Sequence, residues 1–369
     1  MYLSKLKLNN FKNIVETDLT FCKNVNCFVG ENGVGKTNLL DSIHYLSFCK
    51  SYFNVIDGNN IKHDEDFFAI HGLYNFDDNS SEKFSCSLRK GERKQFRCGD
   101  KEYNRFSEHI GKITLVMITP SDQELIIGAS ELRRRFLDLV ISQADSLYLD
   151  NLIKYNKALE QRNSLLKHFS NNMSFDEQSL LIWDEQLISY GSKIHRKRKE
   201  FIEDFANLFQ FYYNFISSEK ESVSLDYESL DLENNYSQLL IGARQKDRVL
   251  GYTSIGIHKD DLGLKMDNRN IKKYASQGQQ KSFLLALKLA QFEYIFKRTK
   301  IKPILLLDDI FDKLDLSRIS KLMELVGSDR FGQSFITDTQ IGRIEDIFKS
   351  TDIEHRIYKL TEKGIVDEK

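Results

Sequence analysis

The eight residues GENGVGKT, from Gly30 to Thr37, match the nucleotide-binding pattern G-x-x-x-x-G-K-[ST]. Its glycines let the backbone turn so that successive N–H groups face an anion, and the following helix adds its positive end. In this pattern Lys36 reaches the β- and γ-phosphates, and the hydroxyl of Thr37 ligates Mg²⁺. We therefore predict a loop that binds a nucleoside triphosphate. Its predicted binding residues are Gly30, Glu31, Asn32, Gly33, Val34, Gly35, Lys36 and Thr37.

Two adjacent carboxylates, Asp308 and Asp309, follow the apolar run ILLL. Such a run is typical of a buried parallel strand, and open α/β sheets bind ligands at the carboxyl ends of such strands. Adjacent carboxylates at a buried strand end are costly unless a cation or a reaction needs them. An acidic surface turn is the alternative, but the presence of Lys36 and Thr37 favours catalysis. We predict Asp308 as the carboxylate on the Mg²⁺ side, Asp309 as the group that polarises the attacking water, and Lys36 as its catalytic partner.

A third stretch, YASQGQQKSFLLALKLA (274–290), brings small and amide residues around Gly278 directly into a long apolar helix. A helix that begins in this way can hold an anion with its first N–H groups. Ser276 can equally be an ordinary cap that accepts hydrogen bonds from the first turn. The residues alone leave both interpretations open.

The elements that must position these residues follow from apolar periodicity. Residues 24–30 predict a buried strand and residues 36–48 a helix, so the phosphate loop has the strand–loop–helix context that it requires. Residues 66–115 alternate as short strands of an antiparallel subsheet, and residues 130–216 have helical spacing. We predict an α/β P-loop fold with a mixed sheet, an antiparallel subsheet and an inserted compact helical lobe. The predicted bounds are 1–129 and 240–369 for the head and 130–239 for the lobe.

Composition sets broad limits on the kind of protein. The chain has 369 residues and a formal net charge of -1, so any surface for nucleic acid must be local. Its five cysteines show no C-x-x-C spacing, and no apolar run approaches the length of a membrane span. We predict a soluble cytoplasmic protein with reduced thiols and no membrane contact.

The stretch SQGQQ stands where ATP-binding-cassette ATPases carry their signature, and KLD (313–315) stands at their D-loop. The chain thus resembles that superfamily, in which the signature helix caps the γ-phosphate of ATP held by the opposite subunit. The resemblance implies that Ser276, Gly278 and Gln279 bind the nucleotide of a partner, so that ATP joins a homodimer.

The stretches LNNFKNI, ELRRRFLD, ALEQRNSLLK and IHKDDL narrow the resemblance to the RecF family over nearly the whole chain. That resemblance implies an ATP-dependent dimer that binds duplex DNA or single-strand/double-strand junctions without sequence preference. Together with RecR and RecO, such a dimer promotes RecA loading at gaps, in recombinational repair and at replication forks. A weak, DNA-stimulated ATPase resets it. The chain departs from the family pattern at Ile257 and Lys259, where proline and arginine are usual.

Two further assignments stay open on the residues. The Q-loop residue is either Asp122 or Gln123, and Asp338 with Thr339 stands where cassette transporters have a switch histidine. Basic clusters at 89–94, 133–135 and 195–199 are candidates for phosphate contacts, although each is more often a solvated face.

Two other functions compete with the RecF-like one. A chromosome-organising SMC head shares the cassette but needs a long coiled coil between its nucleotide motifs, and the intervening segment here is short. A nuclease-coupled or small-molecule ATPase is the other alternative, and it needs a further carboxylate or histidine cluster that the eight histidines do not suggest.

Overall fold

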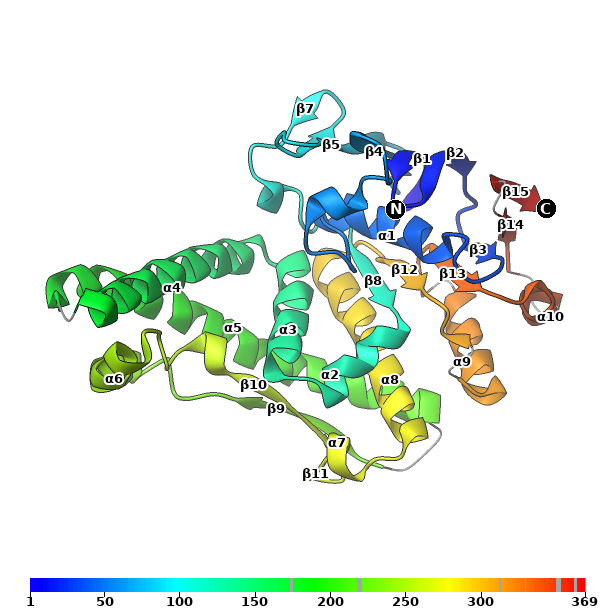
Figure 1. Ribbon diagram of the computed structural model, residues 1–369. Helices are drawn as coiled ribbons and strands as arrows, with labels where there is room; N and C mark the ends of the chain where they lie inside the picture. Colours follow the sequence, from blue (N-terminus) through cyan, green and yellow to red (C-terminus); the bar gives the residue numbers. More distant parts are fainter. Residues whose placement is uncertain are drawn as a thin grey trace. The chain divides into compact units, whose positions relative to one another are not determined.

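The computed structural model describes residues 1–172, 175–217, 221–311, 314–328, 330–349, 353–361 and 364–368 (Figure 1). The chain divides into two compact units, which are described one at a time. The first unit comprises residues 1–122, 212–218 and 281–369, and the second comprises 123–211 and 219–280.

The first unit contains a six-stranded, mostly parallel sheet with strand order β15-β14-β3-β13-β12-β8. Only β15 pairs antiparallel. Every residue of β3, β8, β12 and β13 is buried, as predicted for β3 and β12 from their apolar runs. The strands are β3 (Val25–Val29), β8 (Leu115–Ile118), β12 (Ile304–Leu307), β13 (Ser334–Asp338), β14 (His355–Thr361) and β15 (Gly364–Glu368).

A six-stranded antiparallel sheet with order β2-β1-β4-β5-β6-β7 completes the core of this unit and confirms the predicted subsheet. Burial in β1 alternates from Lys5 to Asn9, and a bulge between Leu3 and Lys5 shifts the register. The strands are β1 (Tyr2–Phe11), β2 (Ile14–Thr20), β4 (Phe67–Asn75), β5 (Ser81–Arg89), β6 (Gln95–Cys98) and β7 (Lys101–Glu102).

Helix α1 packs between the two sheets of the first unit, since it contacts β8 and β13 as well as β1, β4 and β5. It is therefore buried along nearly all its length, which explains its weak amphipathic pattern. The helices described for this unit are α1 (Lys36–Phe48), most of α8 (Gln277–Thr299), α9 (Leu316–Val326) and α10 (Ile341–Lys349), with 3-10 turns η1 (Asp57–Asn60), η2 (Phe106–Glu108) and η3 (Pro120–Gln123).

The second unit is mainly helical, which confirms the predicted helical insertion. It also carries a three-stranded sheet with order β11-β10-β9. Its helices are α2 (Glu124–Ile127), α3 (Ser130–Ala144), α4 (Ser146–Asn172), most of α5 (Glu177–Ser217), α6 (Tyr236–Leu250) and α7 (Ile271–Tyr274), with the turn η4 (Ile257–Lys259). Its strands are β9 (Val223–Glu228), β10 (Asp261–Met266) and β11 (Arg269–Asn270). The bounds 130–239 remain a prediction about domain limits; the compact unit also includes 123–129 and 240–280 and lacks 212–218.

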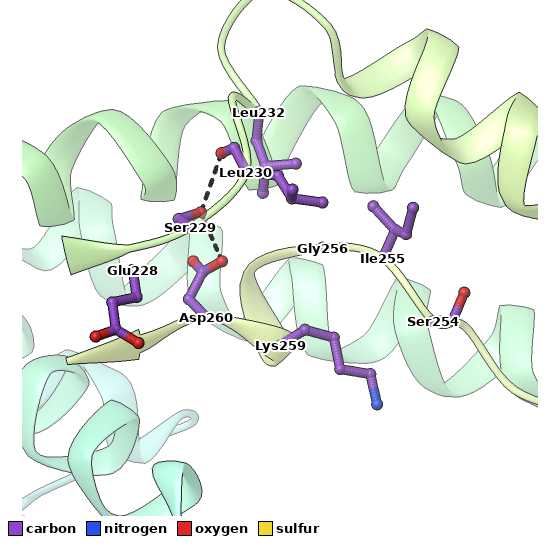
Figure 2. A pocket seen from close by; sticks show the side chains of 9 residues that line it. All are labelled: Glu228, Ser229, Leu230, Leu232, Ser254, Ile255, Gly256, Lys259 and Asp260. Carbon is purple, nitrogen blue, oxygen red and sulfur yellow. Dashed lines mark hydrogen bonds between the residues drawn. The ribbon is translucent and has the colours of Figure 1, made fainter. Parts of the chain in front are cut away.

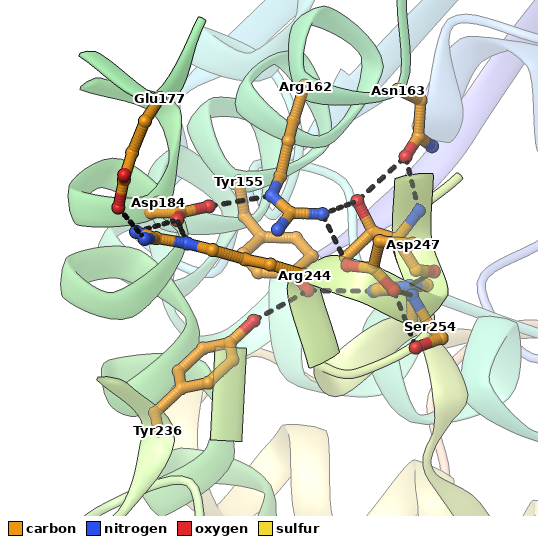
Figure 3. A network of polar contacts seen from close by, with 11 residues as sticks. Tyr155, Arg162, Asn163, Glu177, Asp184, Tyr236, Arg244, Asp247 and Ser254 are labelled. Carbon is orange, nitrogen blue, oxygen red and sulfur yellow. Dashed lines mark hydrogen bonds and ion pairs between the residues drawn. The ribbon is translucent and has the colours of Figure 1, made fainter. Parts of the chain in front are cut away.

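A buried arginine holds three helices of the second unit together (Figure 3). Arg162 of α4 is fully buried; its Nε donates to Asp184 of α5 at 2.7 Å, and its Nη1 donates to Asp247 of α6 at 2.7 Å. The same Nη1 donates to the hydroxyl of Thr253 at 2.9 Å. Arg244 adds ion pairs to Asp184 and Glu177. The central arginine of the ALEQRNSLLK stretch is thus part of the core of this unit.

Among the described residues, no helix has both the length and the apolar character that a membrane span requires.

Candidate nucleotide site

The phosphate loop joins the end of β3 to the start of α1, as its motif predicts. Gly33 and Gly35 have φ values of 86° and 108°, a left-handed conformation that side-chain-bearing residues rarely adopt. A Cβ atom on Gly35 would also lie 2.7 Å from the Oδ1 atom of Asn13. That side chain lies against the loop, since Asn38 Nδ2 donates to Asn13 Oδ1 at 2.8 Å. The stretch LNNFKNI contains Asn13, but nothing in the sequence indicated this role.

Lys36 lies at the start of α1, and its ammonium group bends back over the loop. Nζ donates to the carbonyl oxygens of Gly30 at 2.7 Å and Glu31 at 2.9 Å. Burial lowers the pKa of Lys36, while the carboxylates of Asp309 and Asp308 oppose that shift. The ammonium is thus held in the loop by backbone oxygens that a phosphate group could replace.

Asp308 follows β12 and lies within hydrogen-bonding distance of two hydroxyls. Its Oδ1 accepts from Thr37 Oγ1 at 2.9 Å and from Thr337 Oγ1 at 2.9 Å. Burial raises the pKa of Asp308, and these two hydrogen bonds counteract the shift. A hydroxyl and a carboxylate at this distance form the hard-oxygen donor set that Mg²⁺ prefers, so the residues present fit the predicted ion.

Asp309 has an unusual backbone conformation. Its φ of 48° lies in the left-handed region, which costs about 1–2 kcal/mol for a residue with a side chain. Such conformations persist when surrounding contacts hold them, and they cluster at functional sites.

A cavity of about 240 Å³ brings the predicted residues together. Residues of the phosphate loop and of α1 line it together with Asp309, which is distant in sequence, and with Thr337, which sequence reasoning missed. The lining residues are Asn32, Gly33, Gly35, Lys36, Thr37, Asn38, Asp309 and Thr337. The only sequence signal for Thr337 was its place at the end of the strand-like run SFIT.

The start of α8 shows the cap that the residues allowed. The Ser276 N–H donates to Gln279 Oε1 at 2.8 Å, and the Gln279 N–H donates to Ser276 Oγ at 3.2 Å, which is a reciprocal capping box. Gln279 Nε2 also donates to Glu221 at 2.6 Å, and Gly278 lies within the first helical turn. Ser276 remains exposed within its unit. In the KLD stretch, Lys313 lies outside the described residues, while Asp315 caps α9.

The structure narrows the Q-loop alternatives, because Asp122 is buried and its carboxylate has internal partners. Thr119 N–H donates to Oδ2 at 2.7 Å, while Tyr52 hydroxyl and Lys288 Nζ contact Oδ1 at 2.7 and 2.6 Å. These contacts give Asp122 a structural role. Gln123 is then the remaining candidate.

Asp338 at the end of β13 has a similar internal role. Arg343 contacts both of its carboxylate oxygens, with Nη2–Oδ1 at 2.7 Å and Nε–Oδ2 at 2.9 Å. Gln340 N–H donates to Oδ1 at 2.7 Å. The residue at the expected switch position thus binds the first turn of α10, and it does not line the cavity.

Several of the basic residues weighed as phosphate contacts bind carboxylates of the chain itself. Arg198 is almost fully buried and pairs with Asp138 at 2.7 Å, and His195 is also buried. Arg133 donates to both oxygens of Asp261, at 2.7 and 2.8 Å. His195 and Arg198 therefore do not belong to an exposed basic face at 195–199, because the helical spacing turns these two side chains inward.

A second cavity, of about 230 Å³, lies in the helical unit (Figure 2). At its wall Ser229 Oγ donates to Asp260 Oδ1 at 2.6 Å and lies 3.2 Å from His195 Nδ1. The three residue types match a hydrolase triad, but in a triad the imidazole stands between hydroxyl and carboxylate. Here the hydroxyl stands between the imidazole and the carboxylate and donates its proton to the carboxylate, so the order of a triad is not reproduced.

Comparison with known proteins places the chain among relatives that match its full length. The RecF/RecN/SMC N terminal domain family matches residues 2–359. The DNA replication and repair protein RecF of Phocaeicola vulgatus is 47% identical over 370 residues, covering 100% of this chain and 99% of that protein. RecF of Flavobacterium johnsoniae is 51% identical over 360 residues, covering 98% and 100%.

Solved structures agree with this relationship. A structure of the recombination mediator protein RecF with ATP, in the RecFOR pathway, has a TM-score of 0.90 and 29% identity, and covers 100% of this chain and 98% of that chain. An SMC head bound to the C-terminal winged-helix domain of ScpA shares the fold alone, with a TM-score of 0.57 and 14% identity over 100% of this chain and 98% of that one. The fold is thus the α/β ABC-type ATPase head of SMC and RecF proteins with a helical insertion, and the chain belongs to the RecF family.

Proposed function

We propose that this protein is an ATP-dependent DNA-binding protein of recombinational repair and replication-fork maintenance, in which ATP joins two copies of the chain. The observation that carries the proposal is the single cavity where Lys36, Thr37 and Asp309 meet, in a chain related over its full length to proteins named RecF. Its chemistry suits a triphosphate, since it combines glycine-loop N–H groups, an ammonium and carboxylates.

In this proposal the residues of the cavity divide the work of ATP hydrolysis. The loop from Gly30 to Thr37 and the ammonium of Lys36 bind the phosphates, while Thr37 and Asp308 hold Mg²⁺. When bound, that ion neutralises charge on the phosphate oxygens. Asp309 orients a water molecule, whose oxygen bonds to the γ-phosphorus as the bond to the bridging oxygen of ADP breaks. Gln123 is the proposed Q-loop residue.

The start of α8 supplies the other half of the site from the partner copy. Ser276, Gly278 and Gln279 of each copy close over the γ-phosphate of the nucleotide that the other copy holds, and slow hydrolysis releases the dimer. Exposure of Ser276 within its unit supports the role, because a partner can reach it. The cap that Ser276 makes with Gln279 keeps the helix start rigid without a partner.

The names of the relatives, DNA replication and repair protein RecF and a recombination mediator in the RecFOR pathway, support the following proposed partners. Binding to duplex and single-stranded DNA or their junctions is sequence-independent, RecR and RecO act with the dimer, and the outcome is RecA loading at gaps. We also propose that the head spans 1–129 and 240–369 and the lobe 130–239.

Ser276→Arg tests the shared nucleotide site directly. A bulky cation at the interface should weaken ATP-driven dimerisation by about 2 kcal/mol or more, roughly thirty-fold, while ATP binding to the monomer stays at the wild-type value. Sedimentation with and without ATP measures the first quantity, and a fluorescent ATP analogue measures the second. Ser146→Arg is the matched control, because Ser146 is also an exposed serine at the start of a helix. Equal loss of dimer and monomer binding would contradict the cross-subunit role.

DNA binding should depend on ATP and steeply on salt. A dimer that neutralises roughly six phosphates is expected to lose about a thousandfold in affinity between ~50 and ~200 mM salt. Fluorescence anisotropy with duplex, single-stranded and junction DNA of two unrelated sequences checks both points. Affinity that ignores ATP, or that differs strongly between the two sequences, would argue against an ATP-gated, sequence-independent clamp.

A further inference from the structure

Thr337 lies on β13, the strand between β3 and β12. β13 pairs in parallel with β3, which leads into the phosphate loop, and with β12, which leads to Asp308. Thr337 is almost completely buried, and its side chain lines the cavity. A hydroxyl here is thus adjacent to the ends of both functional strands.

The hydroxyl of Thr337 joins the two neighbouring acidic residues. It donates to Asp308 Oδ1 at 2.9 Å and accepts the backbone N–H of Asp309 at 2.8 Å. A hydroxyl has one proton to donate, so the bond from the Asp309 N–H directs that proton to Asp308. Because Thr37 donates to the same Oδ1 at 2.9 Å, this oxygen is fixed by hydroxyls from two different elements.

The second hydrogen bond supports the strained backbone at Asp309. The left-handed φ of 48° needs surrounding contacts to hold it, and the bond from its N–H to Thr337 is such a contact. Losing that acceptor would remove the hydrogen bond from a part-buried N–H and free the peptide to rotate, which would re-aim the carboxylate.

Asp338, the next residue of β13, binds a different element, the start of α10. Its carboxylate is held by Arg343 and by the Gln340 N–H, so it stays directed at α10. Successive residues of a strand point to opposite faces, and here only Thr337 points into the cavity.

From this geometry we infer that Thr337 is a positioning residue of the ATPase site: it fixes Asp308 toward Thr37 and holds Asp309 in its strained, water-facing conformation. The inference rests on the proposed ATP hydrolysis at this cavity. The hydroxyl of Thr337 thus positions the two catalytic carboxylates. Asp338, at the switch position, cannot do so, because its carboxylate is held by Arg343.

Thr337→Val and Thr337→Ser test the inference, since valine keeps the shape and removes both hydrogen bonds whereas serine keeps them. Thr337→Val should lower the single-turnover rate of ATP hydrolysis by about tenfold to a hundredfold, and should reduce the gain in affinity for a fluorescent ATP analogue that Mg²⁺ provides. Affinity without Mg²⁺ should stay within about threefold of wild type, because Lys36 and the loop are unchanged. Thr337→Ser should recover most of both losses.

Thr114→Val is the matched control. Thr114 is a fully buried threonine of the same unit whose hydroxyl has no hydrogen-bond partner among the described residues. Its turnover and Mg²⁺ response should equal those of wild type, and thermal unfolding checks that each variant is folded.

Three outcomes would overturn the inference: wild-type turnover and Mg²⁺ response in Thr337→Val, equal defects in the valine and serine variants, or an equal loss of affinity with and without Mg²⁺. A wild-type protein that neither hydrolyses ATP nor binds it more tightly with Mg²⁺ would instead overturn the proposed ATPase function itself.

Discussion

Asp309→Asn is expected to lower the rate of ATP hydrolysis by about a hundredfold to a thousandfold while ATP binding stays at the wild-type value. Asparagine has the same shape but no charge, so it loses the ability to polarise water. It also tolerates a left-handed backbone, and the φ of 48° therefore needs no rearrangement. Rapid-quench single-turnover assays measure the rate, and a fluorescent ATP analogue measures binding.

The same variant should accumulate as an ATP-bound dimer, because hydrolysis is the step that separates the two copies. Sedimentation in saturating ATP is expected to show a dimer that persists, whereas the wild-type dimer decays as ATP is consumed. Asp64→Asn is the matched control, since Asp64 is another aspartate with left-handed φ, 65°, and it is largely exposed. Wild-type turnover in Asp309→Asn would remove this residue from the reaction. A monomer in saturating ATP would count against the shared site.

The second large effect concerns stability. Arg162→Ala is expected to lower the free energy of unfolding of the helical unit by about 3–5 kcal/mol, because it leaves the buried carboxylate of Asp247 without its cation and removes one of the two arginines that pair with Asp184. Loss of the hydrogen bond to Thr253 adds to the cost. The expected result is an earlier unfolding transition in urea, followed by circular dichroism at a helical wavelength. A chain with two compact units need not unfold in one step, so the transitions are fitted separately.

Arg196→Ala provides the comparison, since Arg196 is an exposed arginine on α5 of the same unit. Its effect should stay within about 0.5 kcal/mol. If the two variants unfold at the same urea concentration, the Arg162 network contributes little to stability.

The amino-acid sequence by itself determined the features that depend on short stretches of chain. The phosphate loop is one of these, because its glycines and Lys36 act through local backbone geometry between one strand and the helix that follows. The buried strand before Asp308 is another, since an unbroken run of apolar residues predicts burial on both faces of a strand. The cap at Ser276 also follows from residues three positions apart.

Only the tertiary structure decided which distant groups meet. The position of β13 between β3 and β12 brings Thr337 to Asp308 and Asp309, and strand order is set by the packing of segments far apart in the chain. Likewise Arg198 resembles part of an exposed basic run until its carboxylate partners from other elements are known. The physical reason is the same in both cases: a local pattern fixes which face of an element is buried, whereas the partner of each buried polar group depends on what packs against that face.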